Sequence, residues 1–283
     1  MINSGKILGY EVPQAIKGTI LEQIVETKLH EIVGVKQKFP AASLRMALDR
    51  APVVRSFRKS ILRSSPALIA EIKRRSPSAG ILRRDFDPAG IAREYEDSGA
   101  AAISVVTEGK HFAGGLEILA MLRWQSKIPL LRKDFLIDSY QILEARHAGA
   151  DAVLLIAALL DASSLRKMRE EAEGIGMEAL VEVHDEIELD RALESGAVLI
   201  GVNNRDLRTF EVSLETCFRL AGRLPGNAIP VAESGIRSAD DVQRLMDTGY
   251  RGFLIGEQLL RAPSPGAALS KLFPRSAASR RAS

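Results

Sequence analysis

Two ionic residues in the stretch ALIAEIKRRSPSAG (67–80) stand where apolar residues are expected. The run that begins at Ala67 is typical of a buried strand, yet it carries Glu71 and Lys73 two positions apart. Side chains alternate between the two faces of a strand, so both charges point the same way. An acid and a base side by side can hold an anionic group and exchange protons with it. The pair therefore predicts a polar site at the end of this strand.

The same feature returns at the ends of other apolar runs along the chain. Ionic or amide groups follow these runs at Glu108, Lys133, Asp134, Glu182, Asn203, Arg205 and Glu233. Removing a charge from water costs several kcal/mol unless partners compensate, so the joint pattern indicates one shared pocket with acid and base groups. For any single residue a structural role stays open, because a buried Glu–Lys pair can complete a core layer and an Asn can cap a turn.

The elements that must position these residues repeat along the chain. Eight short apolar, β-branched runs alternate with amphipathic segments, at residues 67–73, 101–108, 128–135, 151–158, 178–183, 198–204, 229–235 and 252–258. The segments between them carry helix signals, such as Ser238 with Asp241 in a capping box. This pattern predicts the α/β class and a (β/α)8 TIM barrel, in which the carboxyl ends of the strands form the active face. A doubly wound open sheet is the alternative.

Residues 1–66 lie outside the repeat and predict an N-terminal helical extension packed on the barrel. An apolar stripe in TILEQIVETKLHEIV (19–33) predicts one helix, and ASLRMALDR (42–50) a second. This layer covers a rim or wall of the barrel or serves as a dimerisation arm. We expect residues 67–273 to form the barrel as a single domain with the extension, and residues 274–283 to be disordered.

Composition narrows the possible partners. The formal net charge of +3 arises from Arg275, Arg280 and Arg281 in the last ten residues, so residues 1–273 are neutral overall and predict no nucleic-acid-binding face. Cys217 is the one cysteine, which excludes an internal disulfide and indicates a packing role on a helix. The chain shows no secretory signal and no long uncharged apolar stretch, so we expect a cytoplasmic protein without a membrane partner, present as a monomer or weak homodimer.

No pattern for a metal or a nucleotide cofactor stands out. His30, His111, His147 and His184 are scattered and lack the close spacing of a metal site. The chain has neither a dinucleotide-binding glycine fingerprint nor a P-loop. We therefore expect neither a metal nor a cofactor.

Two glycine-containing turns predict a phosphate site. Ser234 and Gly235 follow the seventh run, and Gly256 and Glu257 follow the eighth, where many barrels bind phosphate through backbone N–H groups. Glycine lets an anion approach the backbone closely. Ordinary turn glycines are the alternative, because each signal alone is weak.

An ordered series of motifs resembles the indole-3-glycerol phosphate synthase family. The motifs are EIKRRSPSAG, SVVTEGKHFAGG, PLLRKDF, LLIAALL, LVEVH, GVNNRDL, VAESGI and FLIGEQL, and the resemblance runs from about residue 18 to 272. It implies a carboxy-lyase of tryptophan biosynthesis that closes 1-(2-carboxyphenylamino)-1-deoxyribulose 5-phosphate to indole-3-glycerol phosphate, releasing carbon dioxide and water without a metal.

The resemblance also implies roles for the strand-end residues. Lys133 matches the principal general acid, Glu182 an acid/base group for dehydration, and Lys73 an anchor for anionic substrate groups. Glu71 and Glu233 order the charges, and Asn203 holds a hydroxyl or a catalytic carboxylate. Because burial disfavours charge, we expect Glu182 to be biased toward holding a proton and Lys133 to release one more easily.

Further matches predict the substrate contacts. An apolar wall for the aromatic ring is formed by Pro77, Phe112, Phe135 and Leu207, with Ser76 on an anionic group and Arg205, Ser234, Gly235 and Gly256 on the phosphate. Plain packing of loops on the rim is the alternative for the apolar set. Glu257 stands where some relatives have Ser, so its carboxylate is expected to point away from the phosphate. The loops at 74–87 and 132–139 are expected to be mobile covers.

Three rival functions remain at this point. Another phosphosugar barrel, such as a phosphoribosylanthranilate isomerase, would share the phosphate signals but lack EIKRRSPS together with RKDF. A non-catalytic scaffold would have lost Lys133 or Glu182, and both are present. Nucleic-acid binding through the arginine-bearing tail would depend on residues 274–283.

Overall fold

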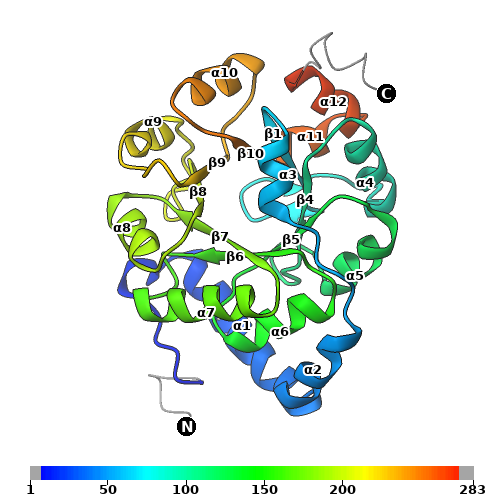
Figure 1. Cartoon of the computed structure of the whole chain (residues 1–283), viewed down its shortest axis with the longest axis vertical. Coiled ribbons are helices and arrows are strands. Elements are labelled where there is room, and N and C mark those ends of the chain that lie inside the picture. The colour runs from blue at the N-terminus through cyan, green and yellow to red at the C-terminus, as the bar shows by residue number, and fades with distance from the viewer. Residues whose placement is uncertain (1–7, 274–283) are drawn as a thin grey trace.

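Eight parallel strands close into a barrel in the computed structural model, which describes residues 8–273 (Figure 1). The strands are β1 (Ala67–Ile72), β4 (Ala102–Val106), β5 (Leu130–Lys133), β6 (Ala152–Ile156), β7 (Glu178–Val183), β8 (Leu199–Asn203), β9 (Ile229–Glu233) and β10 (Gly252–Ile255). β1 pairs with both β4 and β10, which joins the first strand to the last. The predicted (β/α)8 barrel is confirmed, and the open-sheet alternative is wrong because the sheet has no edge.

Strand register brings the predicted charges to one end of the barrel. Asn203 lies opposite Glu233 between β8 and β9, and Glu182 lies opposite Ile156 between β7 and β6. Lys133 lies opposite Val106, and Glu71 opposite Ser104. These pairs all sit near the carboxyl ends of their strands. Parallel closure therefore gathers side chains that are far apart in sequence onto the face where barrel enzymes place their active sites.

Helices follow the strands and form the outer layer. They are α4 (Pro88–Asp97), α5 (Leu116–Gln125), α6 (Ser139–His147), α7 (Ala162–Gly174), α8 (Glu186–Glu194), α9 (Glu215–Ala221) and α10 (Ala239–Asp247), with α11 (Glu257–Arg261) and α12 (Pro265–Leu272) after β10. The predicted capping box of α10 is present, with Asp241 N donating to Ser238 Oγ at 3.1 Å and Ser238 N donating to Asp241 Oδ2 at 2.9 Å. Cys217 is buried on α9, which agrees with a packing role.

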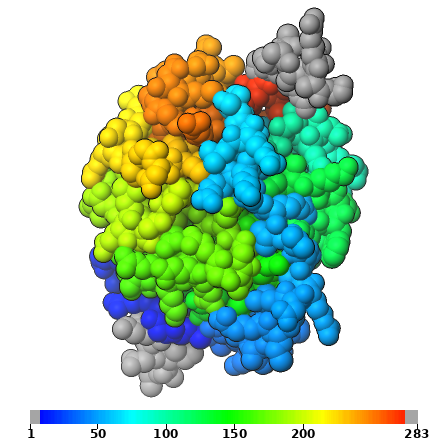
Figure 2. All heavy atoms as spheres, in the orientation of Figure 1, coloured from blue at the N-terminus to red at the C-terminus, as the bar shows by residue number. Residues whose placement is uncertain are grey.

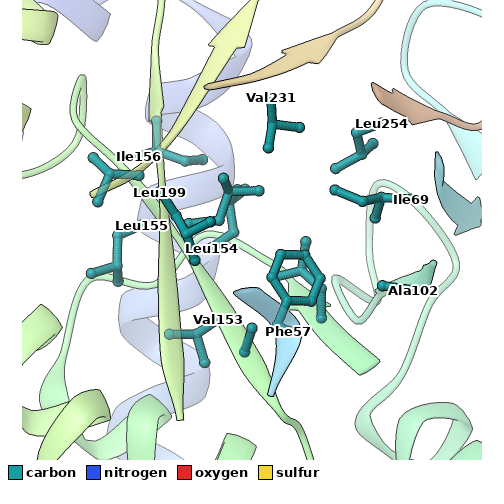
Figure 3. Packing of buried hydrophobic residues seen from close by; sticks show 14 of the residues in the cluster. Phe57, Ile69, Ala102, Val153, Leu154, Leu155, Ile156, Leu199, Val231 and Leu254 are labelled. Carbon is teal, nitrogen blue, oxygen red and sulfur yellow. The ribbon is translucent and has the colours of Figure 1, made fainter. Parts of the chain in front are cut away.

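The barrel interior below the polar face is filled by apolar side chains. Ile69, Val231 and Leu254 from three different strands lie together (Figure 3), and all are buried. Phe57 of α3 (Phe57–Arg63) is fully buried beneath them. A close-packed interior of this kind leaves the strands little room to move, so the strand ends above it keep fixed positions.

The N-terminal extension lies along one side of the barrel. It consists of η1 (Gln14–Ile16), α1 (Ile20–Lys38), α2 (Ala41–Ala47) and η2 (Leu48–Arg50), followed by α3. The two helices expected at 19–33 and 42–50 are therefore present, the second ending in a 3-10 turn. Figure 1 and Figure 2 show α1 and α2, in dark blue and blue, at the opposite end of the molecule from α12, in red, whereas α3 lies near the middle of the view.

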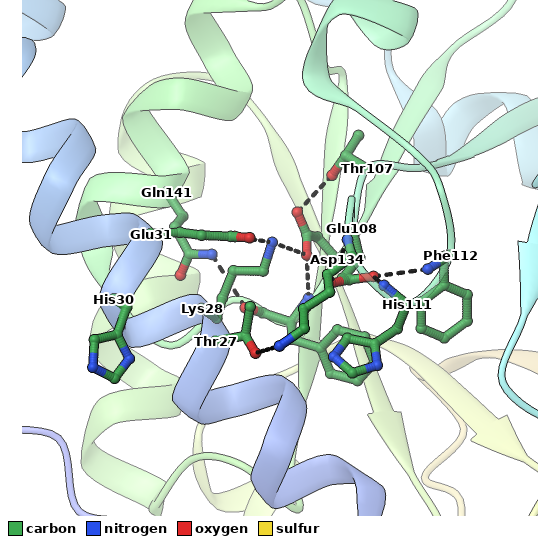
Figure 4. Close-up of polar contacts among 12 residues, drawn as sticks. Thr27, Lys28, His30, Glu31, Thr107, Glu108, His111, Phe112, Asp134 and Gln141 are labelled. Atoms are coloured by element: carbon green, nitrogen blue, oxygen red, sulfur yellow. Dashed lines mark hydrogen bonds and ion pairs between the residues drawn. The ribbon is translucent and has the colours of Figure 1, made fainter.

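One buried ion pair ties α1 to the strand that carries Lys133. Lys28 Nζ lies 3.2 Å from Asp134 Oδ1 and 2.9 Å from Glu31 Oε2 (Figure 4). Asp134 Oδ2 also accepts hydrogen bonds from Thr107 Oγ1 at 2.7 Å and Arg132 Nη2 at 3.2 Å. Asp134, the residue next to Lys133, is thus held by Lys28 of α1, by Thr107 directly after β4 and by Arg132 of β5.

The loop after β1 contains an element that the sequence did not predict. Two-residue strands β2 (Arg75–Ser76) and β3 (Gly80–Ile81) form an antiparallel hairpin. Strands of two residues are too short to show an alternating pattern, so their pairing depends on the Pro- and Gly-containing turn between them. The tail expected to be disordered, 274–283, lies outside the described residues. No helix within 8–273 is both long enough and apolar enough to cross a lipid bilayer.

Replacing Lys28 with Met is expected to lower the free energy of unfolding by up to about 3 kcal/mol, because it leaves one carboxylate oxygen of buried Asp134 without its cation. Lys38→Met, at the exposed end of the same helix, is the matched control and should change stability by less than about 0.5 kcal/mol. Urea unfolding of the three proteins measures both values. Equal stability of the two variants would contradict the importance of the Lys28–Asp134 pair.

Candidate active site

A cavity of about 790 Å³ opens at the carboxyl ends of the strands. Its lining includes every residue to which the resemblance assigns a role, namely Glu71, Lys73, Ser76, Pro77, Phe112, Lys133, Phe135, Glu182, Asn203, Arg205, Leu207, Glu233, Ser234, Gly235, Gly256 and Glu257. The volume suits a single small-molecule ligand. The strand ends therefore form one shared pocket, as the joint charge pattern indicated.

The centre of the pocket is a lysine between two buried carboxylates. Lys133 Nζ lies 3.0 Å from Glu182 Oε2 and 3.3 Å from Glu233 Oε2. Asn203 Nδ2 donates to Glu182 Oε1 at 3.0 Å, and Asn203 Oδ1 accepts the backbone N–H of Arg205 at 3.0 Å. Side chains from β5, β7, β8 and β9 thus fix one another in a single hydrogen-bonded cluster.

The protonation expected for Lys133 and Glu182 from burial alone is wrong. Burial by itself lowers the pKa of Lys133, but Glu182, Glu233 and Glu71 together raise that pKa well above the ordinary lysine value. Burial likewise raises the pKa of Glu182, but Lys133, His184 and Asn203 hold it well below the ordinary range. Lys133 is therefore an ammonium and Glu182 a carboxylate, because the neighbouring opposite charges outweigh the loss of water.

Glu233 differs from Glu182 although both contact the same lysine. Burial raises the pKa of Glu233 to about 8, and the Glu182 carboxylate acts in the same direction, against the ammonium of Lys133. Glu233 Oε1 is buried and has no hydrogen-bond partner among the described residues. One ammonium stabilises only one of two neighbouring carboxylates fully, so Glu233 holds a proton for much of the time at neutral pH.

Two glycines make room for the buried carboxylates. A Cβ on Gly201 of β8 would collide with Glu233 Oε1, and a Cβ on Gly256 would collide with Glu71 Oε1. Gly201 was not among the predicted site residues. A glycine inside a strand signals close approach of another group, but the sequence does not show which group approaches.

The β1 charges and an apolar wall both line the pocket. Lys73 Nζ lies 2.5 Å from Glu71 Oε1, and Ser76 and Pro77 of the hairpin line the same pocket. The rings of Phe112 and Phe135 are also part of the lining, with centroids 6.0 Å apart. Further apolar lining comes from Leu207 and from Ile20, Leu21 and Ile24 of α1. The apolar stripe of the extension was recognised in the sequence, but its place in the pocket was not.

Glu108, one of the predicted strand-end charges, does not line the pocket. It is fully buried and accepts the backbone N–H groups of Lys110 at 3.1 Å, His111 at 2.7 Å and Phe112 at 2.9 Å (Figure 4). Its carboxylate therefore fixes the loop that carries Phe112. For Glu108 the structural role, which was left open for any single strand-end residue, is therefore correct.

The turns after β9 and β10 bring arginines into the pocket lining. Ser234 and Gly235 turn the chain after β9 with φ of +61° and +79°, and Gly256 is the N-cap residue of α11. Arg205, Arg237 and Arg261 also line the pocket, the last two of which the sequence did not single out. Their positive charge and the free backbone geometry of the turns suit a phosphate group.

The Glu257 carboxylate, expected to point away from a bound phosphate, lies near two arginines of the pocket. Glu257 Oε1 lies 3.1 Å from Arg261 Nε, and Glu257 Oε2 lies 3.8 Å from Arg205 Nη2. Arg261 stands one helical turn after Glu257 on α11. The carboxylate therefore offsets part of the positive charge of these two arginines.

A histidine that the sequence analysis set aside stands behind Glu182. His184 Nε2 lies 3.2 Å from Glu182 Oε1, and His184 Nδ1 lies 2.8 Å from Glu188 Oε2. The signal was present, because Glu182 and His184 are two residues apart at the end of a strand, as Glu71 and Lys73 are. His184 was considered only as a metal ligand, and its place beside Glu182 was missed.

Comparison with known proteins identifies the family. A family model described as indole-3-glycerol phosphate synthase matches residues 21–272. The chain belongs to the indole-3-glycerol phosphate synthase family. Curated synthases from Polaromonas naphthalenivorans and Albidiferax ferrireducens are 45% and 47% identical over 258 residues, which cover 90% of this chain and 98% of each relative. The synthase from Carboxydothermus hydrogenoformans is 47% identical over 262 residues, covering 89% and 98%.

Membership decides between the functions that the sequence left open. The family forms indole-3-glycerol phosphate in tryptophan biosynthesis, so the chain is a carboxy-lyase acting on a small molecule rather than a phosphosugar isomerase or a non-catalytic scaffold.

Solved structures of lower identity support the barrel alone. Thiamine phosphate pyrophosphorylase from Pyrococcus furiosus superposes with a TM-score of 0.57 at 20% identity, covering 75% of this chain and 95% of its own. A KGPDC structure from Streptococcus mutans gives a TM-score of 0.56 at 14% identity, covering 74% and 96%.

Gly201→Ala is expected to reduce turnover at least about tenfold, because the new Cβ displaces the Glu233 carboxylate from Lys133. Gly226→Ala is the control, since a Cβ there meets no atom within 4 Å. Steady-state kinetics of indoleglycerol phosphate formation measure the difference, with thermal unfolding to establish that both variants are folded. Wild-type turnover by folded Gly201→Ala would show that the position of Glu233 does not matter.

Proposed function

We propose that the chain closes 1-(2-carboxyphenylamino)-1-deoxyribulose 5-phosphate to indole-3-glycerol phosphate by general acid–base catalysis without a metal, with Lys133 as the principal acid. The observation that carries this proposal is the position of the Lys133 ammonium, between Glu182 and Glu233 at the centre of the pocket. An ammonium there supplies the positive charge and the proton that the substrate ketone oxygen needs.

The first step is attack of the aromatic carbon on the ketone carbon. A carbon–carbon bond forms, the carbonyl π electrons move to oxygen, and Lys133 donates a proton to that oxygen. The high pKa of Lys133 in its cluster of carboxylates does not prevent this, because a developing alkoxide is a stronger base than an amine. Lys133 therefore remains charged until the transition state creates a base able to take its proton.

Decarboxylation and dehydration complete the reaction. Loss of CO₂ returns its bonding electrons to the ring and restores aromatic character. The hydroxyl then leaves as water, which requires one proton on oxygen and removal of another from the substrate. Glu182, held as a carboxylate, is the base for this removal. The carboxylate leaves as neutral CO₂, so one proton is taken up per turnover, and protonated Glu233 beside Lys133 is a suitable source.

The cations and backbone turns of the pocket match the two anionic groups of the substrate. Lys73 and Ser76 are assigned to the carboxylate and the rings of Phe112 and Phe135 to the aromatic ring, with Pro77 and Leu207 completing the wall. The phosphate is assigned to Arg205 and to the backbone of the turns at Ser234, Gly235, Gly256 and Glu257. Glu71 orients Lys73, and Asn203 orients Glu182.

The proposal extends to the organisation of the chain. All the assigned residues come from one chain, which supports activity as a monomer or weak homodimer. Three residues of α1 line the pocket, and Lys28 ties α1 to Asp134, which supports one folding unit formed by the extension 1–66 and the barrel 67–273. No step of the assigned reaction requires a cofactor or a nucleic acid.

Lys133→Ala is expected to lower kcat at least about 100-fold while leaving the fold intact, because the acid is lost but the barrel packing is not. Lys127→Ala, at an exposed lysine, is the control and should retain full activity. Indole fluorescence of the product, followed with a chelator present, measures turnover and tests metal independence at once. An active Lys133→Ala enzyme would refute its role, and loss of wild-type activity in chelator would refute the metal-free mechanism.

Glu257→Ser is expected to lower the KM for the substrate about fivefold with little change in kcat, because it removes a carboxylate that pairs with Arg205 and repels the phosphate. Glu257→Gln keeps the size and removes the charge, so it should reproduce most of the effect. Initial rates across substrate concentrations measure both constants. A KM that is unchanged or higher in both variants would place the phosphate elsewhere.

A further inference from the structure

His184 is the one described residue that links the Glu182 carboxylate to a charge outside the pocket. Its Nε2 lies 3.2 Å from Glu182 Oε1, although the alignment falls short of a hydrogen bond, so the contact is mainly electrostatic. Its Nδ1 is paired with Glu188 Oε2 at 2.8 Å, and the same oxygen accepts the backbone N–H of His184 at 2.9 Å. Glu188 thus fixes both the backbone and the ring of His184.

We propose that His184, held by Glu188, is a positioning residue that keeps Glu182 ionised while Lys133 gives up its proton. The inference rests on the proposed role of Glu182 as the base in dehydration. The pair consists of His184, which follows β7, and Glu188 of α8. Neither residue lines the pocket, and both act on the reaction through Glu182.

The need for such a residue follows from the change of charge during turnover. In the resting site Glu182 is stabilised by Lys133 on Oε2, and by Asn203 and His184 on Oε1. When Lys133 donates its proton it becomes a neutral amine, and Asn203 carries no charge. His184 is then the remaining cation in contact with Glu182 among the described residues. Without it, a buried carboxylate would take up the next available proton and lose its function as a base.

The charges around His184 favour its cationic form. Burial by itself lowers the pKa of His184, but Glu182 on its own strand and Glu188 from α8 together raise it to about 10. Arg208, in the loop after β8, is paired with Asp206 and acts on Asp185 and Glu188 only through weaker electrostatic interactions, while Lys133 acts on Glu182 from the pocket side. A ring between two carboxylates is protonated on both nitrogens, so each nitrogen has a hydrogen for one acid.

The pH dependence of kcat tests this inference. We would compare wild type with His184→Gln and Glu188→Gln at saturating substrate, from about pH 5 to 9, with His147→Gln on the exposed face of α6 as the control. The pKa tested is that of Glu182 beside neutral Lys133, because in the resting site the ammonium holds the pKa of Glu182 below this pH range. Removing the His184 cation lets the pKa of Glu182 rise in the state with neutral Lys133. The acidic limb of the kcat profile should therefore move to higher pH by about one unit in His184→Gln. On that limb kcat falls roughly tenfold, and it recovers at higher pH. Glu188→Gln, which keeps the acceptor oxygen, should shift the limb in the same direction by less.

If the acidic limb of both variants superimposes on that of wild type, the inference is overturned. This holds even if kcat falls equally at every pH, because a purely structural role lowers the whole profile. Nitrogen NMR of labelled histidine in wild type gives a second measurement that needs no variant. We expect the His184 ring to be protonated at about pH 8, and a neutral ring would overturn the inference. Glu182→Gln separates the two proposals, since substantial turnover in that variant would refute the proposed role of Glu182 itself.

Discussion

The site depends on one ammonium placed between two buried carboxylates. Lys133 from β5 lies within 3.3 Å of both Glu182 from β7 and Glu233 from β9. Neither carboxylate can remain ionised in a dry barrel without a cation nearby, and the lysine likewise needs acids. The ammonium stabilises Glu182 more than Glu233, with help from Asn203 and His184. That inequality places a carboxylate, an ammonium and a partly protonated carboxyl group within one cluster, which the proposed mechanism uses as base, acid and proton source.

The rest of the barrel serves to keep this cluster together. Parallel closure places alternate strands opposite one another across the interior, and the apolar layer below prevents them from shifting. Glycines at 201 and 256 admit carboxylates where any side chain would exclude them. Outside the barrel, the buried Lys28–Asp134 pair holds α1 against the residue that follows Lys133. Helix α1, which supplies part of the apolar wall, is thereby linked to β5, which carries Lys133.

Paired charges recur in the pocket and behind it. Lys73 is paired with Glu71, and Arg205 lies near Glu257. Each of these cations is held in place by an acid. His184 is held in the same manner by Glu188. Prepositioned charges of this kind require little reorganisation during the reaction, which is the usual source of electrostatic catalysis.

The sequence by itself determined the architecture and most of the residues that line the pocket. Eight apolar runs predicted the closed barrel, and polar residues at their ends predicted the pocket, because strand periodicity and barrel closure together leave such residues only one place to meet. The tertiary structure alone decided how those residues are charged and paired. The charge of Lys133 and of Glu182, the approach of Glu257 to Arg205, the clamp role of Glu108, and the place of His184 behind Glu182 all follow from distances between distant segments. Electrostatic energy depends on those distances, and sequence separation does not contain them.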